Sequence, residues 1–277
     1  MMMFKKLALT AVAVGGLAAA TPSYAVVTTF ADFSATTQVR NIRWQKVGSK
    51  NGMIYSTSTG SANTPGNVNV KFSFLQPYFT NNNIAQSVTA VFLLSGTTTN
   101  DAASKTPLPT VPPTNYLTQS IDSLTFSFKS TAPITVGNVT YAAGSNLLSG
   151  TVVANSTIGG TDGGFSAGLT NSTAGGNTVT YTSDFLDFSN TVNRSFSISL
   201  DALLAAVGSP PVNKGLNAGN GQSLSSFRAT ATGSFSSDPA PIINAVPEPA
   251  VWGMMIAGFG VVGFQSRRRR SIKSVTA

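Results

Sequence analysis

Alternation of apolar and polar residues with a period of two limits most strongly what this chain can fold into. Val68–Phe74 alternates at every position, and Leu124–Phe128, Phe196–Leu200 and the longer Phe227–Phe235 repeat the pattern. Successive side chains of a strand point to opposite faces, so each stretch is expected to be a strand with one face in a core. Val88–Leu94 is apolar on both faces, which predicts a central strand.

Shorter segments between turn residues complete an all-β pattern. Ile134–Tyr141, Leu147–Val153 and Thr178–Thr182 are predicted strands, separated by Gly, Asn and Ser. Only Asp201–Val207 has a helical pattern, which the following Gly and Pro would end. Several short strands without alternating helices favour a single antiparallel β-sandwich or jelly-roll-like domain.

The domain is expected to span residues 26–235. Residues 97–115 and 209–222 are predicted loops within it, because neither separates pieces large enough for two cores. A Pro- and Ser-containing stalk is predicted at residues 236–246. The chain has no Cys, so core burial rather than disulfides must hold the domain together.

The composition excludes several kinds of catalytic site. There is no His and no Cys, and the only Glu is Glu248, which excludes Ser-His-Asp and Cys-His machinery and the usual zinc sites. A glycosidase that uses two Asp stays open, although the eight Asp form no recognisable constellation. Gly159–Gly164 and Gly175–Asn177 lack the Lys and the strand–loop–helix context of a phosphate loop, so both are predicted turns. We expect no enzyme and no cofactor.

Binding chemistry has three candidates in the middle of the chain. Asp162, Asp184 and Asp187 lie near Gly- and Ser-rich turns and could offer oxygen ligands to calcium, but their spacing matches no calcium loop. Trp44 is the only Trp of the predicted domain and could be a sugar platform, a core residue or a strand-edge residue. Dense Ser, Thr and Asn could bind sugar hydroxyls or simply keep an exported β-protein soluble.

The N-terminus has the pattern of a secretory signal peptide at residues 1–25. Lys5 and Lys6 precede an apolar run, and Ser23 and Ala25 supply small residues at the −3 and −1 positions of a signal peptidase site. Cleavage after Ala25 is therefore predicted, and an uncleaved N-terminal anchor is the alternative.

The C-terminal residues 247–277 combine a stiff peptide, an apolar stretch and a basic cluster. Pro247 and Pro249 fix φ and favour extended neighbours, so the peptide around Glu248 should not be helical. Ala250–Phe264 contains fifteen uncharged residues, which as a helix would span roughly 22 Å, less than the ~30 Å hydrocarbon core. The positive-inside rule keeps Arg267–Arg270 cytoplasmic and places the preceding sequence on the far side of the membrane. A permanent tail anchor and a buried helix are the alternatives.

This C-terminal pattern resembles a PEP-CTERM sorting signal, in the variant with a Trp three residues after the second Pro. Gly253 stands where that variant usually has Ala. The resemblance implies recognition by an exosortase, a membrane-embedded transpeptidase-like enzyme of Gram-negative bacteria that make exopolysaccharide, and removal of the helix and the Arg cluster. The residues that carry it are Pro247, Glu248, Pro249, Trp252, Gly258, Gly260, Gly263, Arg267, Arg268, Arg269 and Arg270.

Without its two ends the chain is nearly neutral. Ten Lys and Arg remain between residues 26 and 246 against eight Asp, so no basic stripe is left and nucleic acid is not an expected partner.

Together with the resemblance to a sorting signal, this composition predicts a non-enzymatic exported protein that is held briefly in the inner membrane. It would then reach the cell surface or extracellular matrix, in association with exopolysaccharide or biofilm. A carbohydrate-binding adhesin, with or without calcium, is the main alternative. A two-Asp glycosidase and an ice-binding protein are further ones, although the chain lacks a regular Thr-x-Thr ladder.

Overall fold

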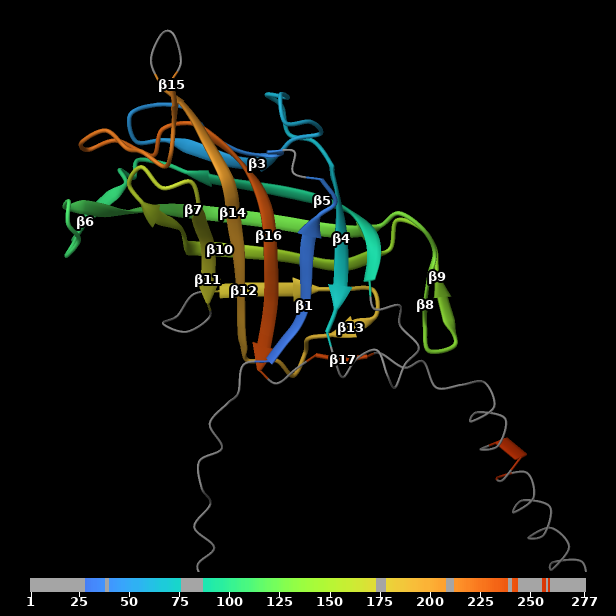
Figure 1. Cartoon of the computed structure of the whole chain (residues 1–277). Coiled ribbons are helices and arrows are strands. Elements are labelled where there is room, and N and C mark those ends of the chain that lie inside the picture. Colours follow the sequence, from blue (N-terminus) through green and yellow to red (C-terminus); the bar gives the residue numbers. More distant parts are fainter. Residues whose placement is uncertain are drawn as a thin grey trace, which may run out of the picture.

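The computed structural model describes residues 28–37, 40–75, 87–172, 178–207, 212–238, 241–243, 256–257 and 259. Nearly all regular structure in these residues is β-strand, and helix occurs only at residues 256–257 and 259. The prediction of an all-β domain is therefore confirmed (Figure 1). The strands are β1 (Thr28–Ala35), β2 (Ile42–Lys46), β3 (Gly52–Ser56), β4 (Val68–Phe74), β5 (Ser87–Thr98), β6 (Ser104–Leu108), β7 (Thr114–Ser130), β8 (Ile134–Val136), β9 (Val139–Tyr141), β10 (Asn146–Thr161), β11 (Ala167–Ser172), β12 (Thr178–Thr182), β13 (Leu186–Asp187), β14 (Asn193–Val207), β15 (Val212–Lys214), β16 (Phe227–Asp238) and β17 (Ile242–Ile243).

Antiparallel pairing joins most of these strands into one sheet that closes on itself. The ring runs β1, β4, β5, β7, β10, β11, β14 and β16, and β16 pairs again with β1. Two long strands change partners along their length, because β5 pairs first with β4 and then with β3, and β16 pairs first with β2 and then with β1. The hairpin of β2 and β3 thus bridges β16 and β5 at one end of the ring.

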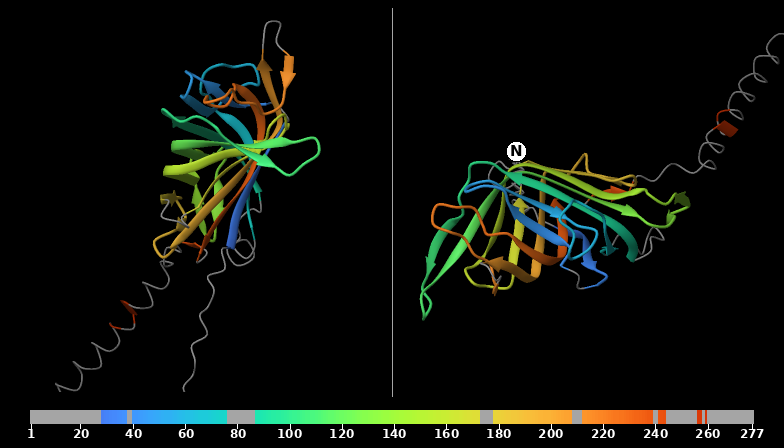
Figure 2. Two further views of the ribbon diagram at one scale, coloured as in Figure 1. Left: turned by 90° about the vertical axis from the view of Figure 1, so that its left-hand side faces the viewer. Right: turned by 90° about the horizontal axis from the view of Figure 1, so that it is seen from above.

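The predicted sandwich corresponds to this structure only in part. In Figures 1 and 2, β7 and β10 cross the direction of β14 and β16 at a steep angle, as two layers would. The strand pairings nevertheless make the layers one continuous sheet instead of two separate sheets. The twist between neighbouring strands accumulates along the sheet, which lets its two edges meet.

A cluster of Phe side chains fills the interior enclosed by the closed sheet. Phe33, Phe72, Phe92, Phe128 and Phe235 come from β1, β4, β5, β7 and β16, and each is at most 2% exposed. The rings of Phe92 and Phe128 stack with centroids 4.6 Å apart, and that of Phe33 lies 4.9 Å from Phe92 and 5.0 Å from Phe128. Phe72, Phe128 and Phe235 are apolar members of the alternating stretches, so the core face predicted for those stretches is confirmed.

Trp44 closes the core where β2 and β3 cover it. Its side chain is fully buried, and its indole Nε1–H donates to the carbonyl oxygen of Leu224 at 2.9 Å. Gly52 on β3 lies against the ring, where an added Cβ would be 2.2 Å from an indole carbon. Trp44 is therefore a core residue and cannot serve as an exposed sugar platform.

The predicted helix at Asp201–Val207 is wrong, because these residues form the last part of β14. Ala205 pairs with Phe227 of β16, and the side chains of Leu203 and Ala205 are buried. The register shifts between Asp201 and Leu204, and Ala202 within this irregularity has φ of 51°. Pairing with β16 and burial against the core override the local helical pattern.

Other local expectations need smaller corrections. Val88–Leu94 does lie in a central strand, β5, but Leu93 is 39% exposed, so only one face packs in the core. Ile134–Tyr141 is a hairpin of β8 and β9 that turns at Gly137, whose φ of 60° suits glycine. Strands also occur within both predicted loops, because β6 pairs with β7 and β15 pairs with β14.

Strand pairing also continues past the residue at which the stalk was predicted to begin. The stalk was expected from Ser236, whereas β16 runs through Asp238. Ile242 and Ile243 form β17, which pairs with Asp187 and Leu186 of β13 (Figure 1). The chain is therefore still attached to the folded body at Ile243.

Candidate functional site

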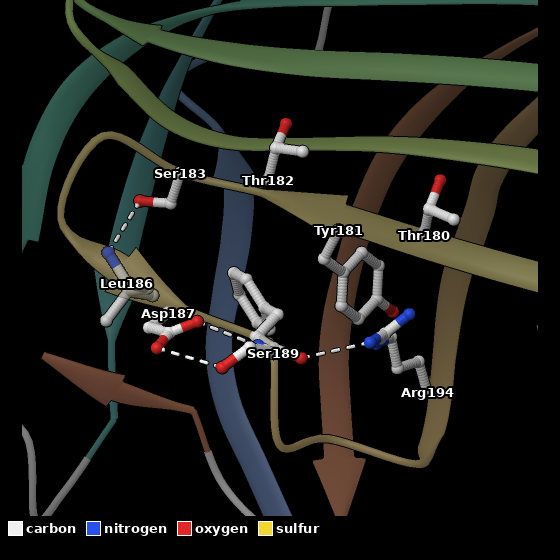
Figure 3. A pocket seen from close by; sticks show the side chains of 9 residues that line it. Thr180, Tyr181, Thr182, Ser183, Leu186, Asp187, Ser189 and Arg194 are labelled. Carbon is white, nitrogen blue, oxygen red and sulfur yellow. Dashed lines mark hydrogen bonds between the residues drawn. The ribbon is translucent and has the colours of Figure 1, made fainter. Parts of the chain in front are cut away.

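A shallow depression of about 440 Å³ lies beside the loop that connects β12, β13 and β14. Figure 3 shows its side chains. Among them Tyr181 lies on β12, Arg194 lies near the start of β14, Asp187 lies on β13, and Ser189 lies in the loop between β13 and β14. The depression thus combines a tyrosine, an arginine and a carboxylate.

Structural hydrogen bonds already use these polar groups. Arg194 donates from Nε to the hydroxyl of Thr191 and from both terminal nitrogens to carbonyl oxygens of Val179, Phe188 and Thr191. The hydroxyl of Tyr181 donates to the carbonyl oxygen of Ser195 at 2.5 Å. These hydrogen bonds hold the loop against β12 and β14, so the role of Tyr181 and Arg194 is structural.

The titration behaviour of the same residues agrees with this role. Burial raises the pKa of the Tyr181 phenol far above its ordinary value, and the charge of Arg194 opposes that rise only partly. Hydrogen bonds from the backbone N–H and then the hydroxyl of Ser189 lower the pKa of Asp187. Near neutral pH the phenol stays neutral and the carboxylate stays charged, so neither is poised to exchange a proton.

The three calcium candidates do not come together. Asp162 lies in the turn after β10, whereas Asp184 lies near the start of β10, where its carboxylate accepts from the backbone N–H of Asn146 at 2.7 Å. Asp187 is committed to Ser189. In the described part of the chain, no three acidic side chains form a group that could hold a metal ion.

The turn predicted at Gly159–Gly164 begins only at Asp162, because Gly159 and Gly160 lie in β10. Residues 175–177, the other predicted turn, lie outside the described ranges.

The outer face of the sheet carries a feature that sequence reasoning missed. Seven neighbouring strands, from β4 across β1, β16, β14, β11 and β10 to β7, place mainly Ser and Thr, together with one Asp, one Lys and two Gly, in two adjacent rows. We call these rows the hydroxyl band. Cross-strand register aligns Lys71, Ser34, Thr232, Ser199, Gly168, Gly159 and Thr118 in one row, and Ser73, Asp32, Ser234, Ser197, Thr170, Thr157 and Ser120 in the other.

Two shallow depressions lie on the hydroxyl band and share Ser197 and Ser199. One, of about 460 Å³, lies over β1, β14 and β16, and the other, of about 410 Å³, extends over β10 and β11. Gly159 forms part of the floor of the second depression, where an added Cβ would lie 2.5 Å from the hydroxyl of Tyr116. Tyr116 is 41% exposed at the rim. The only hint in the sequence was the Ser-x-Ser spacing within strands, because the register between strands cannot be read from it.

All of the residues that the sequence analysis assigns to sorting and cleavage lie outside the described ranges. These are Ser23, Ala25, Pro247, Glu248, Pro249, Trp252, Gly258, Gly260, Gly263 and Arg267–Arg270. Ile256, Ala257 and Phe259 are described and helical, and the side chains of Ile256 and Phe259 are 72% and 73% exposed. Within the described ranges, no helix has the length and apolar character needed to cross a membrane.

Comparison with known proteins gives one match. Neither the curated proteins nor the solved structures contain a match to this chain. Residues 245–270 match the family model described as the PEP-CTERM protein-sorting motif, which confirms the resemblance of the C-terminal pattern. The matched segment begins two residues after β17 ends. The chain therefore carries the sorting motif of PEP-CTERM proteins, and this motif implies export and processing by an exosortase.

Proposed function

We propose that this protein is a non-enzymatic component of the cell surface or extracellular matrix, delivered by an exosortase and associated with exopolysaccharide. The observation that carries the proposal is the sorting motif at residues 245–270. A sorting signal of this kind presupposes that the preceding domain works outside the cytoplasm. Because the chain has no Cys, an exported domain of this kind must be stabilised by its core instead of by disulfides. The buried Phe cluster provides such a core.

A non-enzymatic role is supported by the state of the polar groups. The chain has no His or Cys, and the tyrosine, arginine and aspartate beside β12 are committed to structural hydrogen bonds. A glycosidase needs two carboxylates that face each other across a substrate, about 5 to 10 Å apart. Asp32 and Asp201 line different depressions of the hydroxyl band, and neither depression holds a second carboxylate.

Carbohydrate binding is the second candidate, and the hydroxyl band favours it. Neighbouring strands lie about 4.8 Å apart and every second residue about 6.8 Å apart, so the band offers a lattice of hydroxyl groups at intervals within one sugar ring or linkage. Tyr116 at the rim adds an aromatic surface. The twist of the sheet curves this lattice, which suits a flexible glycan better than the flat surface of an ice crystal.

The main proposal is tested by fractionating cells that do or do not make exopolysaccharide. The processed protein should sediment with the matrix of producing cells and appear in the soluble medium of cells that lack polysaccharide synthesis. The same distribution in both strains would contradict association with exopolysaccharide.

Glycan-array binding by the full-length protein tests the second candidate. Gly168→Leu should abolish binding, because its side chain would project into a depression of the hydroxyl band where only Thr170 comes within 4 Å of an added Cβ, at 3.9 Å. Ser95→Leu is the matched control, since Ser95 is exposed on β5 outside the band. Binding should persist with a calcium chelator, because Asp162, Asp184 and Asp187 are not gathered. Loss of binding in chelator, or equal effects of the two variants, would contradict this assignment.

A further inference from the structure

Two arginines face each other directly across the β2–β16 pair. Arg43 of β2 is the register partner of Arg228 of β16, and both side chains are half-buried. Like charges at directly opposed positions of an antiparallel pair repel and destabilise the sheet. Besides desolvation, the charge of Arg43 lowers the pKa of Arg228, and no described carboxylate acts on it. Among the described residues, Arg228 therefore has no counter-charge.

The loop after β3 holds the two guanidinium groups in place. The side-chain oxygen of Asn63 accepts hydrogen bonds from Arg43 Nη1 and from Arg228 Nη2. Arg228 Nη2 also donates to the carbonyl oxygens of Ser61 at 3.1 Å and Ala62 at 2.8 Å. One oxygen shared by two cations fixes their orientation but does not neutralise them.

One donor of this arrangement has no acceptor. Arg228 Nη1 is buried and makes no hydrogen bond to any described group. Loss of solvation, and then the charge of Arg43, lower the pKa of Arg228. A buried charged donor without a partner is costly, and native structures rarely keep one without an external partner. This unsatisfied donor adds to the cost of holding the two arginines together, but its burial means that a ligand would contact the more exposed atoms of the pair.

Both arginines line a depression of about 300 Å³ at this end of the sheet. Its other lining residues include the half-buried Leu204, which gives it an apolar wall, and Ser226, whose hydroxyl oxygen accepts from the backbone N–H of Lys46. The hydroxyl proton of Ser226 can point to another acceptor. The depression thus combines two cations, a hydroxyl and an apolar surface.

We propose that this depression binds the carboxylate of an acidic polysaccharide, with Arg43 and Arg228 as the anion-binding residues and Leu204 against the sugar ring. The inference rests on the proposed association with exopolysaccharide and names the acidic sugar as its substrate class. Guanidinium groups bind carboxylates through charge-assisted hydrogen bonds, often two in parallel, and a carboxylate in the depression would supply the missing counter-charge. The apolar wall favours a carboxylate carried by a ring over a bare phosphate.

The test measures binding of polygalacturonate to the full-length protein in detergent, with methyl-esterified polygalacturonate of equal length as the neutral comparison. The wild type should bind the acid form about tenfold more tightly than the ester, which corresponds to the loss of one charge-assisted pair. Arg43→Gln and Arg228→Lys should each remove this preference. Lys129→Gln, which removes one positive charge from an exposed site on β7, should keep it.

Thermal unfolding guards against variants that merely fail to fold. Arg43→Gln should unfold at the same or a higher temperature than the wild type without ligand, because it removes a like-charge contact. Polygalacturonate should raise the unfolding temperature of the wild type and leave that of Arg43→Gln unchanged. An equal rise in both proteins, or competition by inorganic phosphate as effective as by galacturonate, would overturn the proposal.

Failure of the site and failure of the proposed function give different results. If the protein sediments with the cellular matrix and Arg43→Gln does so equally, the site is wrong and the function stands. If purified protein selects polygalacturonate through Arg43 but distributes identically in cells with and without exopolysaccharide, the site stands and the function is wrong.

Discussion

Trp44 is a core residue, although its type also suits a sugar-binding surface. Its ring is fully enclosed and its only polar atom is paired with the carbonyl oxygen of Leu224. The sequence left core and sugar-binding roles open, because an isolated Trp in an apolar–polar alternation fits either. Only the fold decides, since it is the close approach of Gly52 and of the segment at Leu224 that buries the ring.

Replacing Trp44 with Phe should lower the free energy of unfolding by about 2 to 4 kcal/mol. The change removes a buried hydrogen bond, leaves the carbonyl of Leu224 without this donor, and opens space beside Gly52. Urea denaturation of wild type and variant measures the difference. A loss below about 0.5 kcal/mol, the range of ordinary surface substitutions, would show that the indole is not a core anchor.

Tyr181 should make the protein sensitive to alkali. Burial raises the pKa of its phenol in the folded state, whereas the unfolded phenol has its ordinary pKa of about 10. The stabilisation is fully present below that pH and is lost as the pH rises, because only the unfolded chain then releases the proton. From pH 10 upward, Tyr181 should contribute a decline approaching about 1.4 kcal/mol per pH unit.

The variant Tyr181→Phe isolates this contribution from that of the other tyrosines. It should be less stable near pH 7, because the hydrogen bond to Ser195 is lost, but its stability should fall less steeply above pH 10. Denaturant titrations at pH 8, 10 and 11 measure the slopes. Identical slopes for the two proteins would mean that this phenol ionises freely in the fold.

At the scale of elements, alternation of residue type located the strands because each has one buried face. Val68–Phe74 coincides with β4, and Phe227–Phe235 lies within β16. The end of β14 was mistaken for a helix, since Asp201–Val207 is rich in Ala and Leu and only its pairing with β16 makes it extended. The hydroxyl band could not be predicted either, because it depends on register between strands distant in sequence.

Ala202 marks the irregular point of β14 and gives a test of this local geometry. Its φ of 51° lies in the left-handed region that costs a non-glycine residue about 1 kcal/mol. Ala202→Gly should therefore raise the free energy of unfolding by up to about 1 kcal/mol, offset in part by the entropy of glycine in the unfolded chain.

Ala167→Gly on β11 is the matched control. Ala167 is a buried strand residue, so glycine should lower the stability there by about 0.5 to 1 kcal/mol or more. Chemical denaturation of both variants gives the signs. A loss at Ala202 as large as that at Ala167 would contradict the left-handed conformation of Ala202.

At the scale of the whole molecule, the folded body lies close to the sorting motif. β17 ends at Ile243, and only three residues separate it from Pro247. Three extended residues reach about 10 Å, so before processing the body would lie next to the membrane-facing peptide. The sequence predicted a stalk from Ser236, but it could not show that β17 pairs with β13 across more than fifty residues of chain.

Sorting by the C-terminal motif is tested most directly by determining the C-terminus of the protein recovered from the cell surface. Mass spectrometry of the released form, from cells with an active exosortase, should find no peptide from residues 254–277. The same analysis of Glu248→Ala should recover those residues on protein that accumulates in the inner membrane, because the Pro-Glu-Pro peptide is the element an exosortase would recognise. Finding residues 254–277 on released wild-type protein would contradict sorting by this motif and leave the segment as a plain anchor.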